Sequence, residues 1–236
     1  MTEPYLYQTI HLRGSRPLRV ARHAELLGEW AAALFGIRYV PAVAALERRI
    51  AALAERERYP RDLSSFVRHE LTADGTERLL PAGVSLYEGF ALRSIAPDAV
   101  TVDFAAPLGE APTSAREAAA ALARVQALRR GAGVAVQRCG DELLTADDAP
   151  LFAVRGNALF TPAIPSGVAR ERVAEACAAV GLQLFEAPLA AADLARFDEL
   201  FYADHRGVTA LAHCDGIPFM ALTAERIAAA MNRLDR

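Results

Sequence analysis

Lysine is absent from this sequence of 236 residues, because every one of its 26 basic residues is arginine. A genome-wide composition bias explains such a replacement on solvated helix faces, for example at Arg48-Arg49 and Arg129-Arg130. The replacement is not neutral where an amine does chemistry, since a guanidinium stays protonated and is a poor nucleophile or base. The absence therefore excludes any mechanism that needs a lysine side chain of this chain.

Cysteine is also scarce. Cys139, Cys177 and Cys214 are odd in number and widely separated, which excludes a disulfide framework and a clustered metal site. We predict that all three are buried small apolar residues in a reducing compartment. No apolar run reaches membrane-spanning length and no signal peptide is visible at the amino terminus, so we expect a cytoplasmic protein.

Excess charge is lacking as well. The net charge of -3 gives no electrostatic argument for a nucleic acid or membrane partner. With 53% hydrophobic and 23% charged residues, the composition is typical of a folded protein of one large domain or two small ones.

The first half of the chain alternates strand and helix patterns. Leu26, Leu27, Trp30 and Leu34 have helical spacing and precede Gly36, and Asp74-Gly75 is a hairpin signal. The patterns predict strands at 5–12, 16–20, 64–73, 77–82, 85–94 and 99–105, and helices at 21–36 and 42–57.

The second half follows a stretch rich in Pro, Gly and Ser at 106–115, which favours a connection between domains. We therefore predict an amino-terminal domain at 1–107 and a carboxy-terminal domain at 108–236. The second is expected to begin with an alanine-rich helix that ends at ALRRGA (127–132). Further strands are predicted in GVAVQR, ELLTAD, PLFAVR, NALFTP, LQLFEAPL, DELFYA and GVTALAHC, and helices in GVARERVAEACAAVG, AADLARF and AERIAAAMNRL.

Several of these segments, in this order, resemble the class IV aminotransferases, the fold-type IV pyridoxal phosphate (PLP) family. They are YLYQTIHLRGSRPLRVARHAELL, ALRRGA, LLTADDAPLFAVRGNALFTP, SGVARERVAEACAAVGLQLFEAPL and DELFYADHRGVTAL. The family includes branched-chain and D-amino acid aminotransferases and aminodeoxychorismate lyase. The resemblance implies a smaller α+β amino-terminal domain, a barrel-like α/β carboxy-terminal domain, and a homodimer with its cleft between the domains.

The resemblance also implies a lysine that forms the Schiff base with PLP, and this chain has none. Counting back from ALRRGA, the lysine position falls on Thr113, whose hydroxyl cannot form an imine. The glutamate that the family places beneath the pyridine nitrogen falls on Thr145, with Asp147 and Asp148 as substitutes if the register shifts. Leu26 stands where the family has its phosphate-binding arginine.

Other positions keep groups that suit a ligand. The helix start at Gly167, Val168 and Ala169 could offer backbone N–H groups to a phosphate. The remaining candidates near the implied cleft are Tyr7, Gln8, Arg116, Asp147, His205 and Arg206. Tyr7 could equally be a packing residue, the His205-Arg206 pair a solvated turn, and His23 a residue that caps or packs its helix.

Three functional hypotheses follow. The first is a family member that has lost Schiff-base chemistry and binds a small anionic or amino-acid-like ligand, or serves as a structural or regulatory homodimer. The second is an active aminotransferase or lyase-like enzyme that holds PLP noncovalently, with Asp147 or Asp148 at the ring nitrogen and His205 as base. The third is an inactive partner of an active paralogue. No metal is expected.

Overall fold

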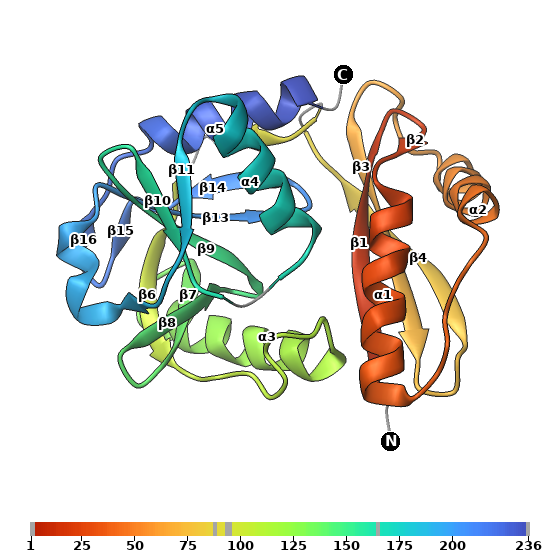
Figure 1. Ribbon diagram of the computed structural model, residues 1–236, viewed down its shortest axis with the longest axis horizontal. Helices are drawn as coiled ribbons and strands as arrows, with labels where there is room; N and C mark the ends of the chain where they lie inside the picture. The colour runs from red at the N-terminus through yellow and green to blue at the C-terminus, as the bar shows by residue number, and fades with distance from the viewer. Residues whose placement is uncertain (1–2, 87–88, 93–95, 164–165, 235–236) are drawn as a thin grey trace. The chain divides into compact units, whose positions relative to one another are not determined.

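The computed structural model describes residues 3–86, 89–92, 96–163 and 166–234, and the chain folds into two units (Figure 1). Residues 1–89 and 111–114 form the first unit, and residues 90–110 and 115–236 form the second. The chain thus returns briefly to the first unit, where the helix α3 (Ser114–Arg129) begins. The sequence predicts two domains that meet after residue 107, and that domain boundary stays a prediction.

The first unit is a four-stranded sheet in the order β2-β1-β3-β4 with two helices on one face. Alternate residues of β1, such as Ile10 and Leu12, point to this face and pack against Ala24 of α1 and Ile50 of α2. This alternation is the pattern from which the strand was predicted. The elements are β1 (Tyr5–Arg13), β2 (Arg16–Pro17), α1 (Val20–Phe35), α2 (Val43–Arg56), β3 (Ser64–Thr72) and β4 (Glu77–Val84).

The predicted turns in this unit are confirmed. Gly36 ends α1 with a φ of 67°, and Gly75 takes a φ of 87° between the antiparallel strands β3 and β4. Both angles lie in the left-handed region, where glycine has no Cβ to clash.

Two predicted strands are wrong in extent. The strand at 16–20 stops at Pro17, because Arg19 takes a left-handed φ of 53° and α1 begins at Val20. Of the strand at 85–94, only β5 (Ala91–Leu92) forms, while residues 87–88 and 93–95 lie outside the described residues. The Ser64 hydroxyl accepts the N–H of Gly89 at 2.7 Å, which holds the chain in a bend rather than a strand.

The second unit contains a sheet of twelve strands within the described chain. Its main path is β16-β15-β6-β7-β8-β9-β13-β14-β5, and β10, β11 and β12 branch from it. A core of residues such as Leu151, Leu200 and Leu211 lies between its strands. The strands are β6 (Asp98–Asp103), β7 (Val134–Cys139), β8 (Glu142–Ala146), β9 (Ala149–Arg155), β10 (Ala158–Thr161), β11 (Gln183–Glu186), β12 (Leu189–Ala190), β13 (Glu199–Asp204), β14 (Gly207–Ala210), β15 (His213–Cys214) and β16 (Ile217–Pro218).

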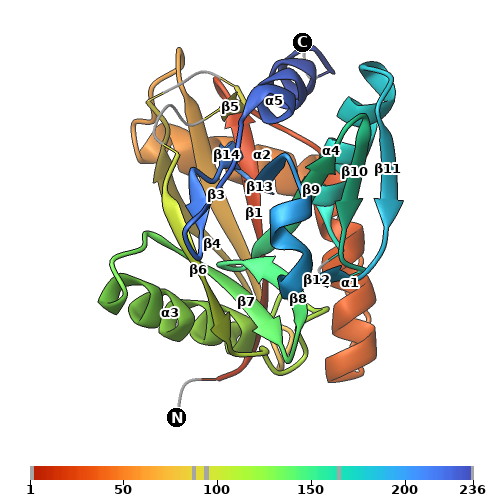
Figure 2. The same cartoon turned by 90° about the vertical axis from the view of Figure 1, so that its left-hand side faces the viewer.

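Helices cover this sheet in two places (Figure 2). α3 (Ser114–Arg129) lies beside β6 and β7, where Ala123 and Ala127 pack against Val102 and Ala135. At another part of the sheet α4 (Val168–Ala179) packs on α5 (Leu222–Leu234), and α5 contacts β13, β14 and β5. The segment 191–196, predicted as a short helix, is the 3₁₀-helix η1 (Ala191–Arg196).

The cysteines differ from the prediction at one position. Cys177 and Cys214 are buried, and burial raises the pKa of their thiols to about 11 and about 12 respectively. Cys139 is exposed, because it ends β7 immediately before the turn at Gly140. Within the described residues, no helix is both long and apolar enough to cross a membrane.

Candidate functional site

Three residues singled out from the sequence lie at the turn between β8 and β9. They are Thr145 near the end of β8, and Asp147 and Asp148 in the turn itself. Asp147 occupies this turn with a φ of 52°, a left-handed conformation that aspartate tolerates better than most residues. Its carbonyl accepts hydrogen bonds from the Thr145 hydroxyl, at 3.0 Å, and from the Gln137 amide. The Thr145 side chain, at the family's glutamate position, is thus bonded to the turn itself.

The Asp147 carboxylate is bonded within the chain at both oxygens. Arg124 of α3 donates to Oδ2 at 2.8 Å, and the backbone N–H of Ala135 donates to Oδ1 at 3.3 Å. Its hydrogen bond to Asp147 raises the pKa of Arg124 above its usual value, and the nearby Asp148 and Tyr202 contribute to the same shift. An Asp147 carboxylate held in this way is not oriented toward a separate ring nitrogen.

Arg116 also belongs to this group. It lies in the first turn of α3, is buried, and donates a hydrogen bond to the Asp148 carbonyl. Arginine side chains from α3 therefore reach both residues of the β8–β9 turn. A guanidinium that binds a carbonyl keeps its charge, so this end of α3 is suited to anions rather than cations.

Thr113, which the sequence resemblance assigns to the family's lysine position, lies in the first unit. Thr113 forms an isolated antiparallel bridge with Leu6, and the neighbouring Pro112 carbonyl accepts the N–H of Tyr7 at 2.9 Å. Residues 111–114 thus run along the edge of β1. Thr113 is buried at this edge, and β1 fixes its backbone position.

Tyr7 and Gln8 lie on opposite faces of β1. Tyr7 stacks beneath the guanidinium of Arg68, whose Cζ lies 4.1 Å from the ring centroid, and Arg68 pairs with Glu70 at 2.7 Å. Gln8 Oε1 lies 2.8 Å from His23 Nδ1 beneath α1. Both candidates therefore have packing partners, and for His23 the predicted packing role is confirmed.

The start of α4 carries the candidate phosphate contacts. Gly167 precedes the helix with a φ of 148° and makes no side-chain cap. The N–H groups of the first turn of a helix, here around Val168 and Ala169, have no partners within the helix. Arg170 follows them, and it donates to the Ala163 carbonyl at 2.5 Å and to Glu186 at 2.5 Å.

His205 and Arg206 form the turn between β13 and β14. Arg206 donates from its backbone N–H to Asp204 at 2.8 Å, and its side chain lies 3.3 Å from the same carboxylate. An Arg206 side chain paired with its own turn is less suited to anchor a ligand anion.

These residues do not fit covalently bound PLP. Thr113 offers no amine, and the Thr145 hydroxyl is bonded to the chain. Leu26, at the family's arginine position, is a buried apolar side chain that offers no charge to a phosphate. Only the start of α4 retains the kind of group that the family uses to hold the cofactor. We therefore derive no reaction step through PLP.

Sequence reasoning missed Arg124 and Gln137, two of the side chains that hold the β8–β9 turn. A pair of aspartates between two strands predicts a turn, but it does not tell which side chains will satisfy the buried groups of that turn. Arg124 appeared as one of several arginines in an alanine-rich helix, and its partner lies 23 residues further along the chain.

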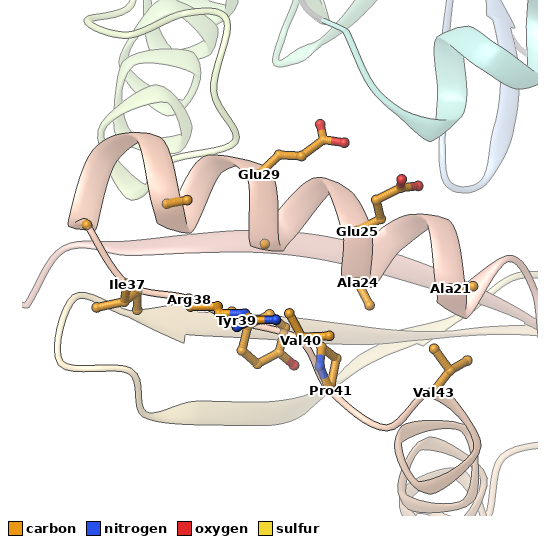
Figure 3. Close-up of a pocket in the computed structure, with 13 residues that line it drawn as sticks. Ala21, Ala24, Glu25, Glu29, Ile37, Arg38, Tyr39, Val40, Pro41 and Val43 are labelled. Atoms are coloured by element: carbon orange, nitrogen blue, oxygen red, sulfur yellow. The ribbon is translucent and has the colours of Figure 1, made fainter.

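A surface groove in the first unit lies apart from every predicted site residue (Figure 3). It has a volume of about 530 Å³ between α1 and the segment 36–43, with Glu25 and Glu29 at its rim. Arg22 pairs with both of these carboxylates, at 2.7 and 3.4 Å. Arg38, in the segment on the opposite side of the groove, also lines it, so the groove carries charged side chains of both signs. Among the described residues, no group of three His, Cys, Asp or Glu side chains could hold a metal ion.

Comparison with known proteins places these observations in a family. The family model "Amino-transferase class IV" matches residues 5–204. The branched-chain aminotransferase of Thermoproteus uzoniensis, solved with norvaline, is 18% identical with a TM-score of 0.80, over 98% of this chain and 84% of that one. A putative 4-amino-4-deoxychorismate lyase from Legionella pneumophila is 20% identical with a TM-score of 0.79, over 97% and 90%.

A hypothetical aminotransferase from Mycobacterium tuberculosis in its PLP-bound form is 18% identical, with a TM-score of 0.80, over 98% of this chain and 90% of that one. At these identities the structural likeness shows the fold, which is the mixed α/β architecture of fold-type IV that the sequence predicted. Among curated proteins, none matches this chain.

Proposed function

Because the chain belongs to the class IV aminotransferase family, we propose that it is a member that has lost Schiff-base chemistry and binds a small anionic or amino-acid-like ligand, as a homodimer. The observation that carries this proposal is the absence of lysine from the sequence, with Thr113 at the position of the family's lysine. No other side chain type in the chain forms a stable aldimine with an aldehyde cofactor.

The surroundings of the β8–β9 turn support the proposal that the chain has lost the acidic side chain that would face the pyridine nitrogen of PLP. In the alternative of an active enzyme that holds PLP noncovalently, Asp147 or Asp148 would have to face the pyridine nitrogen. The pairing of Asp147 with Arg124 and with the Ala135 N–H weighs against Asp147 in that role. His205 would then be the base, and proton transfer without the lysine would be slow.

Ligand binding in our proposal rests on the groups that remain. The start of α4 at Gly167 offers backbone N–H groups, and Arg116 supplies a buried guanidinium in the second unit. A phosphate or carboxylate is the chemistry that these groups favour. A purely structural or regulatory homodimer, or an inactive partner of an active paralogue, would bind no such ligand by itself.

The loss of Schiff-base formation can be tested directly, because the only primary amine in a lysine-free chain is its α-amino group. The purified protein is incubated with PLP, reduced with borohydride and analysed by intact mass and peptide mapping. We expect no cofactor adduct apart from the α-amino group. An adduct at any internal residue, or turnover of D- or L-amino acids or aminodeoxychorismate with PLP, would contradict the proposal that Schiff-base chemistry is lost. Equilibrium dialysis against PLP, pyridoxamine phosphate and inorganic phosphate tests ligand binding separately.

Restoring the amine tests the placement of the lysine position. Thr113→Lys should form an adduct with PLP that borohydride fixes at residue 113, at a stoichiometry near one and at low PLP concentration. The matched control is Ser114→Lys, which places the same amine one residue further along the chain, where α3 begins. Equal adduct formation by both variants would mean nonspecific imine formation and a wrong register.

A further inference from the structure

The helix α3 has two apolar faces, and only one of them is covered within its unit. Its buried face consists of Arg116, Ala119, Ala120, Ala123 and Ala127. On nearly the opposite side, at 3.6 residues per turn, lie Ala118, Ala121, Leu122, Val125 and Leu128. We call this second set the outer face of α3, and all five of its residues are exposed.

The exposure of the large side chains on the outer face is unusual for a helix surface. Leu122, Val125 and Leu128 are 56%, 45% and 60% exposed respectively. Single exposed apolar residues need no explanation, but a contiguous stripe along one helix commonly marks an interaction surface. By contrast, the outward side of α1 carries the ion pairs of Arg22 with Glu25 and Glu29.

We propose that the outer face of α3 packs against the same face of a second copy of this chain, with the two helices antiparallel. In a two-fold arrangement centred between Leu122 and Val125, each of these residues meets the other in the partner copy. The alanines at 118 and 121 allow the helix axes to approach to the 8–10 Å typical of packed helices.

The charges at the two ends of α3 favour this orientation and this partner. Glu117 lies in the first turn and Arg129 in the last, so an antiparallel pair places acid beside base at both ends. Within the described residues Arg129 makes no ion pair, whereas its neighbour Arg130 is bound to Asp215 at 3.2 Å. The helix dipoles also oppose each other in this arrangement.

The size of the outer face sets the expected strength. Sixteen residues of helix span about 24 Å, and one face of such a helix buries less than the roughly 800 Å² per partner of a standard interface. We therefore expect a weak association, with a Kd of about 10 μM. This step would be separate from any dimer that forms through another surface of the chain.

The test is sedimentation velocity of the full chain over a dilution series from about 0.5 to 500 μM, which brackets such affinities. We expect one association step that Val125→Glu weakens about 100-fold, because it buries a carboxylate from each copy in an apolar contact, where each meets a leucine side chain. The matched control is Val40→Glu, which alters a 76% exposed valine outside the outer face and should leave the step unchanged. Thermal unfolding of each variant checks folding, and Leu128→Ser replaces Val125→Glu if the latter does not fold.

Orientation is tested by charge reversal. Arg129→Glu should weaken the association step several-fold, and adding Glu117→Arg should restore it, since an antiparallel pair again joins opposite charges. The absence of any association step at 500 μM, or a step that Val125→Glu leaves unchanged, overturns the proposal. A step that Arg129→Glu weakens but the double variant does not restore overturns the antiparallel arrangement.

Discussion

The two units of this protein stabilise their buried polar groups by different chemistry. In the first unit, side chains bind one another: His69 Nε2 lies 3.0 Å from the Tyr39 hydroxyl and 2.9 Å from Glu77, and Arg49 donates to Glu77 at 2.8 Å. In the second unit, permanently charged arginines and the amides of Gln137 and Asn232 bind backbone carbonyls, as in the bond from Arg172 to the Met231 carbonyl.

The difference determines how each unit responds to its solvent. The Glu77 carboxylate of this network has a lowered pKa and gains a proton as the pH falls, so its contribution to stability depends on pH. An arginine bound to a carbonyl does not titrate. We therefore expect acid to act first on the first unit, and loss of a single arginine to act most strongly on the second.

The largest effect is expected at Arg172. This side chain is almost fully buried between α4 and α5, its Cζ lies 5.0 Å from the Phe90 ring centroid, and its bond to Met231 satisfies one of the last four carbonyls of α5. Arg172→Ala should lower the free energy of unfolding by about 3–5 kcal/mol, as measured by urea denaturation. Arg226→Ala, on the exposed side of α5, is the control and should cost under about 0.5 kcal/mol.

The next effect is expected at Glu77. The hydrogen bond from His69, assisted by Arg49 and opposed by burial, lowers the pKa of Glu77 from 4.5 to about 2. Because the pKa is lower in the folded state, the stabilisation is fully present above pH 4.5 and is lost as the pH falls toward 2. Because solvent screens this partly exposed carboxylate, the loss amounts to about 2 kcal/mol.

Glu77→Gln should remove that part of the acid sensitivity, whereas Glu47→Gln on the exposed face of α2 should not. The sole tryptophan, Trp30, packs in the first unit, so its fluorescence during urea unfolding at pH 5 to 2.5 follows this unit selectively. An unchanged pH dependence in Glu77→Gln would remove the distinction between the two units.

The smallest effect is expected at Asp147, one of the carboxylates that the second unit uses, as it also uses Glu199 to accept the N–H groups of Thr223 and Ala224. Asn tolerates the left-handed φ of 52° and still accepts the N–H of Ala135, so Asp147→Asn loses chiefly the ion pair with Arg124. Because Arg124 is about half exposed, we expect a cost of only about 1–2 kcal/mol. The control is Asp103→Asn, whose pairing with Arg138 is long, at 3.9 Å, and exposed. A cost above 3 kcal/mol would show that this carboxylate, like those of the first unit, is essential to its unit.

Much of the fold could be predicted from the sequence because the signals are local. The hairpin at Asp74-Gly75 and the end of α1 at Gly36 both follow from residues adjacent in the chain. The strands at 16–20 and 85–94 were predicted too long, since the left-handed Arg19 and the bond between Ser64 and Gly89 depend on contacts outside those segments. Cys139 was predicted to be buried from the usual preference of free cysteines, but it ends β7 beside a turn and is exposed.

The sequence by itself determined that this chain has no amine side chain for Schiff-base chemistry, since the absence of lysine needs no coordinates. It also determined the family, through collinear segments that a family model matches over residues 5–204. Only the tertiary structure decided how Asp147 is used, because its partners Arg124 and Ala135 come from other elements. It alone decided which apolar face of α3 is covered, because an alanine-rich helix with two similar faces does not specify in its own sequence which of them meets the sheet.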